Sequence, residues 1–432
     1  MPRNCRSTGP CVIIPAFVSL LGQRLLATIV ALWVVAIAGS SVFAALLPDS
    51  TWVPLTALPN QPRSALFALA VDPANNQVVL AGDAQGSLLR SINGGIAWSV
   101  VRSGKSAIAT IGFNPFTKGL VLAGTRGAGA VISRDAGATW SAARGLDGRV
   151  VRVFAFALSL IAAGTDRGVY LSSDGSTWTQ SGLTNRNINA LAAEAVHEPV
   201  RLVAGSDALA SAGGLPLYQS LDAGVTWKQL TPAVSGSIAV KLATGPLPPK
   251  GNIRPLVMGT NTGLFASKDN GSTFAPLSGG GLLPTTDYTQ VSFITNHFDR
   301  YYVASDGGGS GAGGLWRTNN AGQLFASLRP PEASVTALAV SNDEKPVLYV
   351  ATFQPSTHVA KLWAYHDTGG TPHGPPITPS PVVSGVRTPA ALAQTLLDEL
   401  IQSGRLPYIA LGLGALAVVL TAIAAHLRGR YR

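Results

Sequence analysis

Short apolar runs alternate with Gly- and Asp-rich turns along residues 49–367 of this 432-residue chain. Runs such as 65–71, 77–81 and 87–91 are rich in Val, Leu and Ala, which is typical of β-strands. Their period-two alternation is blurred, as expected where both faces of a sheet are covered by neighbouring sheets. The pattern therefore predicts many short strands joined by tight turns, with helix confined to the two ends of the chain.

One short phrase recurs six times and divides this region into units. Its full form is Ser-x-Asp-x-Gly-x-Thr-Trp, and successive copies start 42, 39, 48, 47 and 51 residues apart. One four-stranded propeller blade recurs at this spacing. The Asp or Asn accepts hydrogen bonds from backbone N–H groups ahead of it and the Gly supplies a positive φ, so each copy predicts a hairpin turn. These turn residues are Asn93, Asp135, Asp174, Asp222, Asp269 and Asn320.

A seventh copy is split between the two ends of the region. Residues 365–369 carry the Asp of the phrase, Asp367, but lack the Thr-Trp that completes the other copies. Residues 50–52, Ser-Thr-Trp, match the missing half. We therefore predict an all-β fold, a seven-bladed β-propeller over 49–367, whose N-terminal strand closes the last blade and leaves no exposed edge.

The repeats resemble the Asp boxes of sialidases, sortilin-type receptors, xyloglucanases and the photosystem II stability and assembly factor family. The resemblance covers residues 50–367 and specifies fold far better than partner. Members of the photosystem family are extracytoplasmic seven-bladed propellers with an arginine-rich surface that docks an unassembled membrane subunit. The resemblance thus implies a scaffold or assembly factor at a membrane, with a photosystem as one candidate complex.

Two apolar segments flank the repeats, where the resembling family has a signal or lipid anchor. Residues 25–47 and 407–426 are long enough to cross the ~30 Å hydrocarbon layer as helices. Arginines precede the first and follow the second, which predicts cytoplasmic termini and an extracytoplasmic propeller. A cleaved secretory signal is the alternative for the first segment. The other predicted parts are a cytoplasmic N-terminal segment (1–24), a Pro/Gly-rich linker (368–387), a juxtamembrane amphipathic helix (388–403) and a basic cytoplasmic tail (427–432).

Metal, disulfide and cofactor chemistry find no support in the sequence. Each repeat offers a single carboxylate, whereas a hard cation such as calcium takes about six to eight oxygen ligands. The only cysteines, Cys5 and Cys11, precede the first apolar segment, so a disulfide scaffold within the propeller is excluded. The six histidines lack metal-ligand spacing, and the glycine run 307–314 lacks the Lys of a phosphate loop. We therefore predict no metal and no cofactor.

Basic residues are concentrated in loops on the propeller face opposite the repeated turns. The chain has a net charge of +10, and in blades two to four only Asp147 and Asp166 oppose these residues. Solvated loop arginines are the alternative interpretation, but the clustering favours a basic crescent that binds an acidic segment of a membrane or cell-surface protein. Nucleic acid is excluded as a partner, and acidic glycan remains an alternative. The predicted crescent comprises Arg63, Arg102, Lys105, Arg126, Arg144, Arg149, Arg167 and Arg186.

A glycoside hydrolase is the main competing hypothesis, because Asp boxes also occur in glycosidases. Most such enzymes need two carboxylates on either side of the scissile bond. The propeller region has only four glutamates, of which Glu332 alone is expected near the channel mouth; the others are Glu194, Glu198 and Glu344. A sialidase-like alternative would combine Arg63, Arg126 and Arg149 with Tyr288 or Tyr301 as nucleophile and Asp306 as acid. We predict instead a non-enzymatic, membrane-anchored scaffold.

Overall fold

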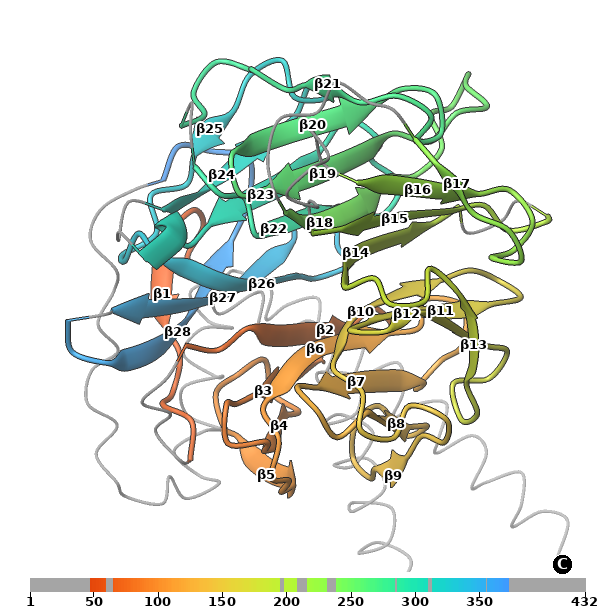
Figure 1. Cartoon of the computed structure of the whole chain (residues 1–432). Coiled ribbons are helices and arrows are strands. Elements are labelled where there is room, and N and C mark those ends of the chain that lie inside the picture. Colours follow the sequence, from red (N-terminus) through yellow and green to blue (C-terminus); the bar gives the residue numbers. More distant parts are fainter. Residues whose placement is uncertain are drawn as a thin grey trace, which may run out of the picture. The chain divides into compact units, whose positions relative to one another are not determined.

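Seven four-stranded antiparallel sheets form the part of the chain that the structure describes (Figure 1). The computed structural model describes residues 47–59, 65–194, 198–207, 216–230, 238–283, 286–309, 313–354 and 356–372. These residues belong to one compact unit that extends to Thr378. The predicted seven-bladed β-propeller is confirmed.

Six blades are meanders whose strands pair in sequence order from the innermost strand outward. Blades one and two consist of β2 (Ala68–Asp72), β3 (Asn75–Gly82), β4 (Leu88–Ser91) and β5 (Ser99–Arg102), then β6 (Ile108–Phe113), β7 (Val121–Thr125), β8 (Ala130–Ser133) and β9 (Ser141–Ala142). Blades three and four consist of β10 (Val151–Phe156), β11 (Ile161–Thr165), β12 (Gly168–Ser172) and β13 (Thr179–Gly182), then β14 (Ile188–Ala193), β15 (Leu202–Ser206), β16 (Leu217–Ser220) and β17 (Lys228–Gln229). Blades five and six consist of β18 (Ala239–Thr244), β19 (Leu256–Thr260), β20 (Gly263–Ser267) and β21 (Ala275–Pro276), then β22 (Gln290–Phe293), β23 (Tyr301–Ser305), β24 (Gly314–Thr318) and β25 (Ala326–Ser327).

The seventh blade joins the two ends of the propeller. Its strands follow the order β26 (Val335–Val340), β27 (Val347–Gln354), β28 (Val359–His366) and β1 (Trp52–Pro54). Trp52 lies opposite Tyr365, with ring centroids 4.8 Å apart, and its indole Nε1 donates to the carbonyl oxygen of Leu328 at 2.8 Å. The predicted closure by the N-terminal strand is therefore correct, and it buries an aromatic pair.

Hydrogen bonds within each repeated phrase shape the turn between the third and fourth strands. In blade four the Ser220 hydroxyl donates to Asp222 and accepts from the backbone N–H of Gly224, both at 2.8 Å. Asp222 also accepts from the backbone N–H and the hydroxyl of Thr226. Gly224 has φ of 89°, and the preceding Ala223 has φ of 58°, so this turn needs two consecutive residues with positive φ. The sequence pattern predicts only the glycine.

The turn of the seventh blade is built differently. Asp367 is fully buried, whereas Asp222 is only partly covered. Its carboxylate accepts a hydrogen bond from Tyr302 Oη at 2.5 Å, forms an ion pair with Arg317 and lies 3.6 Å from Arg300 Nη2. All three partners belong to blade six. Asp367 therefore holds the last two blades together, a role that its place in the repeat does not predict.

Apolar side chains fill the space between adjacent blades. Glycines near the ends of the second strands allow close approach there: a Cβ at Gly82 would overlap Ile108 of the next blade, and one at Gly259 would overlap the Tyr288 carbonyl. Ala-Gly-Thr and related triplets thus recur because a larger side chain would push neighbouring blades apart.

The predicted flanking segments fall almost wholly outside the described residues, as do the linker beyond 372, the amphipathic helix and both terminal segments. Leu47, the last residue of the first apolar segment, is described and is buried in the cluster that contains Leu58 and Leu66. The bounds and the membrane-spanning role of the first segment stay a prediction. Within the described ranges, no helix has the length and hydropathy needed to span a membrane.

Candidate functional site

The meander topology gives the propeller two different faces. The turns between first and second strands lie at the same end of each blade as the repeated turns, and we call this end the turn face. The loops between second and third strands and those between blades lie at the other end, which we call the loop face. Most of the predicted crescent residues are in loops of the loop face.

The crescent begins at the junction of blades one, two and three. The Arg126 guanidinium lies over the Phe67 ring, 5.2 Å from its centroid, and the Arg126 side chain stays exposed. Arg149 Nη1 lies 3.7 Å from Asp166 Oδ2, and both side chains are roughly 30% exposed. An ion pair this open to solvent contributes little stability, and the Arg149 side chain stays partly exposed.

Arg152, which the sequence analysis did not select, lies beside them on the inner strand β10. It is half-buried, and among the described residues its Nη1 is buried without a hydrogen-bond partner. Burial lowers the pKa of Arg152, and the nearby Arg126 adds to that shift, whereas Asp207 and Asp166 oppose it. Asp207 also accepts a hydrogen bond from Asn187 Nδ2 at 2.7 Å. Among the described residues, the guanidinium of Arg152 at the loop-face mouth of the channel therefore has unused hydrogen-bonding capacity.

Two further arginines extend the crescent over blades three and four. Arg167 is exposed at the tip of the β11–β12 hairpin, with Nη1 3.5 Å from Asn185 Oδ1. The guanidinium of Arg186 stacks over Tyr218 at 5.9 Å from the ring centroid. Arg102 is half-buried at the end of β5 and Lys105 is exposed in the following loop, whereas Arg63 lies outside the described residues.

Backbone hydrogen bonds connect Arg144 to blade three. Its backbone N–H donates to the Ser176 carbonyl at 2.8 Å, and its carbonyl accepts from the Trp178 N–H at 2.9 Å. Both partners belong to the repeated turn and outer strand of blade three. The Arg144 backbone therefore lies against the outer part of blade three, and the membership of Arg144 in the crescent stays a prediction.

Blade six contributes a pair of carboxyl groups to the loop face. Asp287 and Asp306 are hydrogen bonded to each other. Burial, together with the bond and the charge of Asp287, raises the pKa of Asp306 to about 7. Burial also opposes ionisation of Asp287, but hydrogen bonds from Asp306, Ser305 and Thr286 outweigh it and lower its pKa. The pair therefore shares one proton below neutral pH.

The described residues do not assemble the hydrolase arrangements considered from the sequence. Tyr301 is 2% exposed and near the turn of blade six, and Tyr288 is 1% exposed and donates to the Leu283 carbonyl. Burial raises the pKa of both phenols, to about 12 for Tyr288, which makes them poor nucleophiles. The hydrogen-bonded Asp287–Asp306 pair is closer than the ~5 Å or more that the two carboxyls of a glycosidase keep.

The four glutamates are also engaged in other contacts. Glu332 accepts from Lys361 Nζ and Thr352 Oγ1, each at 2.6 Å, so it bridges strands of blade seven instead of facing an open site. The remaining partners are Arg201 for Glu194, Ser159 for Glu198 and His297 for Glu344.

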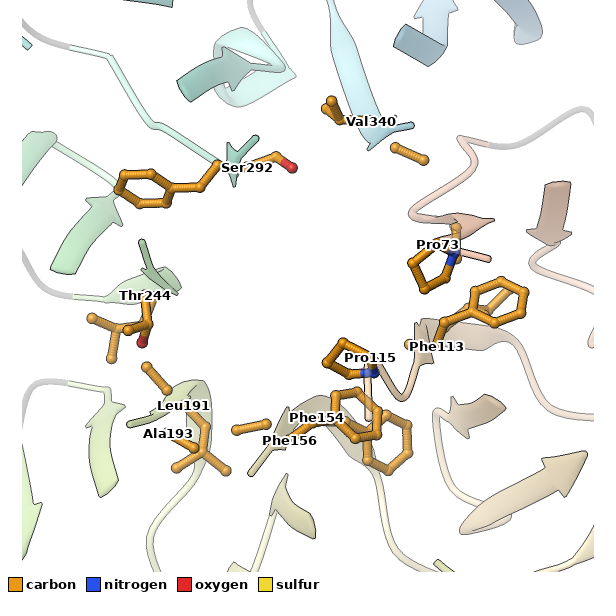
Figure 2. A pocket seen from close by; sticks show the side chains of 18 of the residues that line it. Pro73, Phe113, Pro115, Phe154, Phe156, Leu191, Ala193, Thr244, Ser292 and Val340 are labelled. Atoms are coloured by element: carbon orange, nitrogen blue, oxygen red, sulfur yellow. The ribbon is translucent and has the colours of Figure 1, made fainter. Parts of the chain in front are cut away.

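The central channel opens on the turn face through a hollow of about 480 Å³ whose lining side chains are mostly apolar (Figure 2). Phe113, Phe154 and Phe156 line one side of it, and Thr244 and Ser292 lie across from them. Arg254 is the one charged residue in this lining. The sequence predicts functional surfaces on the loop face alone, so this opening at the other end of the channel is a feature that sequence reasoning missed.

Comparisons with known proteins identify the fold. No protein-family model matches the chain, and no curated protein matches it. Among solved structures, U3-55K matches 74% of this chain and 100% of its own, with a TM-score of 0.55 and 11% identity. A second match is the extracellular domain of the putative one-component system BT4673 from B. thetaiotaomicron, with a TM-score of 0.51 and 12% identity. The match covers 73% of this chain and 40% of the BT4673 chain.

YCF48, in a structure bound to a D1 peptide, matches 74% of this chain and 99% of its own, with a TM-score of 0.49 and 16% identity. Structural similarity at identities of 11 to 16% is evidence about the fold alone. The function therefore has to be argued from the residues of this chain. The chain is a seven-bladed β-propeller similar in structure to U3-55K.

Proposed function

We propose that this protein is a non-enzymatic, membrane-tethered scaffold that binds an acidic segment of another membrane or cell-surface protein through the loop face. The observation that carries the proposal is the group formed by Arg126, Arg149 and Arg152 at the channel mouth. Asp207 and Asp166 are the carboxylates that act on the Arg152 guanidinium, and Arg152 Nη1 has no hydrogen-bond partner among the described residues.

Several features suit this surface to a protein partner. Phe67 and Tyr218 hold two of the arginines by cation–π contact, so little side-chain entropy is lost on binding. Arginine and aromatic side chains are also enriched in protein interfaces. An acidic segment would supply the carboxylates that the cluster lacks, and attraction between opposite charges would speed the encounter.

The test uses the full chain, purified with its partner from solubilised membranes of its host. In one variant Arg126→Glu, Arg149→Glu and Arg167→Glu are combined. The matched control combines Lys118→Glu, Lys250→Glu and Lys268→Glu, which changes the net charge equally at exposed positions of the turn face. We expect the first variant to lose the co-purifying partner and the control to retain it. Equal capture by both would contradict the proposal, as would hydrolysis of sialoside or β-glucan reporters by the wild-type protein.

Membrane tethering rests on the apolar segments 25–47 and 407–426 and is tested separately. Cys5 and Cys11 precede the first segment, and the chain has no other cysteine. A membrane-impermeant thiol reagent applied to intact spheroplasts should label a Thr184→Cys variant at its introduced thiol and leave the native cysteines unlabelled. Labelling of Cys5 or Cys11 under these conditions would contradict the proposed topology.

A further inference from the structure

Exposed apolar side chains are concentrated on the turn face. Of the fourteen large hydrophobic side chains that are exposed among the described residues, nine lie in turns on this face and five lie elsewhere. Blades one to six each contribute at least one, so the nine surround the channel opening. They are Ile92, Ile96, Phe116, Leu158, Leu221, Val225, Leu247, Ile253 and Leu324.

Turn formation does not require these apolar residues. In blade four the turn is held by Ser220, Asp222 and Thr226, whereas Leu221 and Val225 occupy the variable positions between them and are 57% and 73% exposed. Single exposed hydrophobics are common on soluble proteins, but their concentration on one face indicates a surface that is covered in use.

Both ends of the described chain lie on this same face. Ser50 and Thr368 share a hydrogen bond between their hydroxyls, and Asp49 pairs with His366, so the chain enters and leaves beside the turn of blade seven. Leu47 is already buried in the propeller, and at most about 18 Å of extended chain separates it from Trp52. If residues before Leu47 cross a membrane, the turn face is the part of the propeller held nearest to that membrane.

We propose that the turn face rests on a lipid bilayer and inserts its exposed apolar turn residues into the headgroup region. The inference depends on the tether in the proposed function but not on the basic crescent, which would then point away from the membrane. The channel opening, which is lined mostly by apolar side chains, lies in the middle of this surface. Apolar side chains docked in this way enter the bilayer by about 5 to 10 Å.

The test measures the depth of single labelled positions. The full chain carrying Cys5→Ser and Cys11→Ser receives one new cysteine, labelled with the fluorophore NBD and reconstituted into phosphatidylethanolamine–phosphatidylglycerol nanodiscs containing a shallow spin-labelled lipid. Turn-face labels are placed by Val225→Cys, Leu158→Cys and Leu324→Cys, in blades four, three and six. The matched control is Thr184→Cys, which is exposed in a loop of the loop face.

We expect quenching to be several-fold greater at each of the three turn-face positions than at the control. Quenching at none of them, or in one blade alone, would overturn the inference, as would protection that appears only when a protein partner is added. Failure of the tether is distinguishable, because the protein would then not co-purify with nanodiscs at all. Loss of partner capture by the arginine variants would leave the quenching unchanged.

Discussion

The same residue type behaves in opposite ways on the two faces of the propeller. On the turn face, hydrogen bonds from the Thr226 side chain and backbone and the Ser220 hydroxyl lower the pKa of Asp222 to about 2. On the loop face, burial and the neighbouring Asp287 raise the pKa of Asp306 to about 7. All hydrogen bonds to the turn-face carboxylate come from its own eight-residue phrase, whereas the loop-face pair joins two loops that are far less regular.

This difference in pKa reflects two ways in which the sequence determines the two faces. The turn face is specified locally and repeats from blade to blade, so it contributes stability and defines the ring. On the loop face, charged side chains from different blades lie close together, and their neighbours satisfy their hydrogen-bonding capacity only in part. Such side chains are available for binding. If this contrast is correct, substitutions on the two faces should change different measured properties.

The largest expected effect follows from removing the central carboxylate between blades six and seven. Asp367→Ala would leave Arg317 as a buried cation without a carboxylate partner and would remove the buried partner of Arg300. We expect the free energy of unfolding to fall by about 3 to 5 kcal/mol, measured by urea denaturation. Asp222→Ala, at the same repeat position but partly exposed, should cost markedly less; an equal cost would remove the distinction between the two turns.

A smaller loss is expected from crowding a turn. Gly271 has φ of 84°, and an added Cβ would lie 2.6 Å from Val203 Cγ2, so Gly271→Ala introduces backbone strain and a steric clash. The control Gly148→Ala has φ of 70° but nothing within 4 Å of the added atom. We expect a cost of about 1 to 3 kcal/mol at Gly271 and less at Gly148. Equal melting temperatures for the two variants would contradict the close packing between blades.

The carboxyl pair predicts how stability depends on pH. Because folding raises the pKa of Asp306 from 3.8 to about 7, the folded state binds more protons between these values, and its stability decreases as pH rises from about 4 to 7. Solvent screening limits this contribution to about 1 kcal/mol. Asp306→Asn should flatten the denaturation profile in this range. An unchanged slope would show that the two carboxyls do not share a proton.

The smallest effect on stability is expected in the crescent itself. Arg167 is exposed, and among the described residues its side chain makes one long hydrogen bond, to Asn185. Arg167→Glu should change the free energy of unfolding by less than about 0.5 kcal/mol while weakening partner capture. A loss of stability comparable to that of Gly271→Ala would mean that the loop face is as structural as the turn face.

The parts of the molecule that follow the repeat could be predicted from sequence. Spacing and turn chemistry predicted the seven blades, and the unmatched half-phrase at Trp52 predicted the closure, because each signal is contained in a few consecutive residues. The site is less predictable, because its geometry arises between blades. Arg152 stands in an otherwise apolar strand, and only the fold brings Asp166 and Asp207 near it; Arg144 shares the loop composition of the crescent but is held against the turn of blade three.

Pairing between the two ends of the propeller has a consequence for its synthesis. Asp49 and His366 are 317 residues apart, and β1 has no partner until β28 has been made. At ribosomal rates of about 5 to 20 residues per second, the first strand waits on the order of 15 to 60 s. During that interval an apolar edge that includes Trp52 is exposed as the other six blades form, so the nascent chain has to be protected from aggregation or from pairing with another copy until the ring closes.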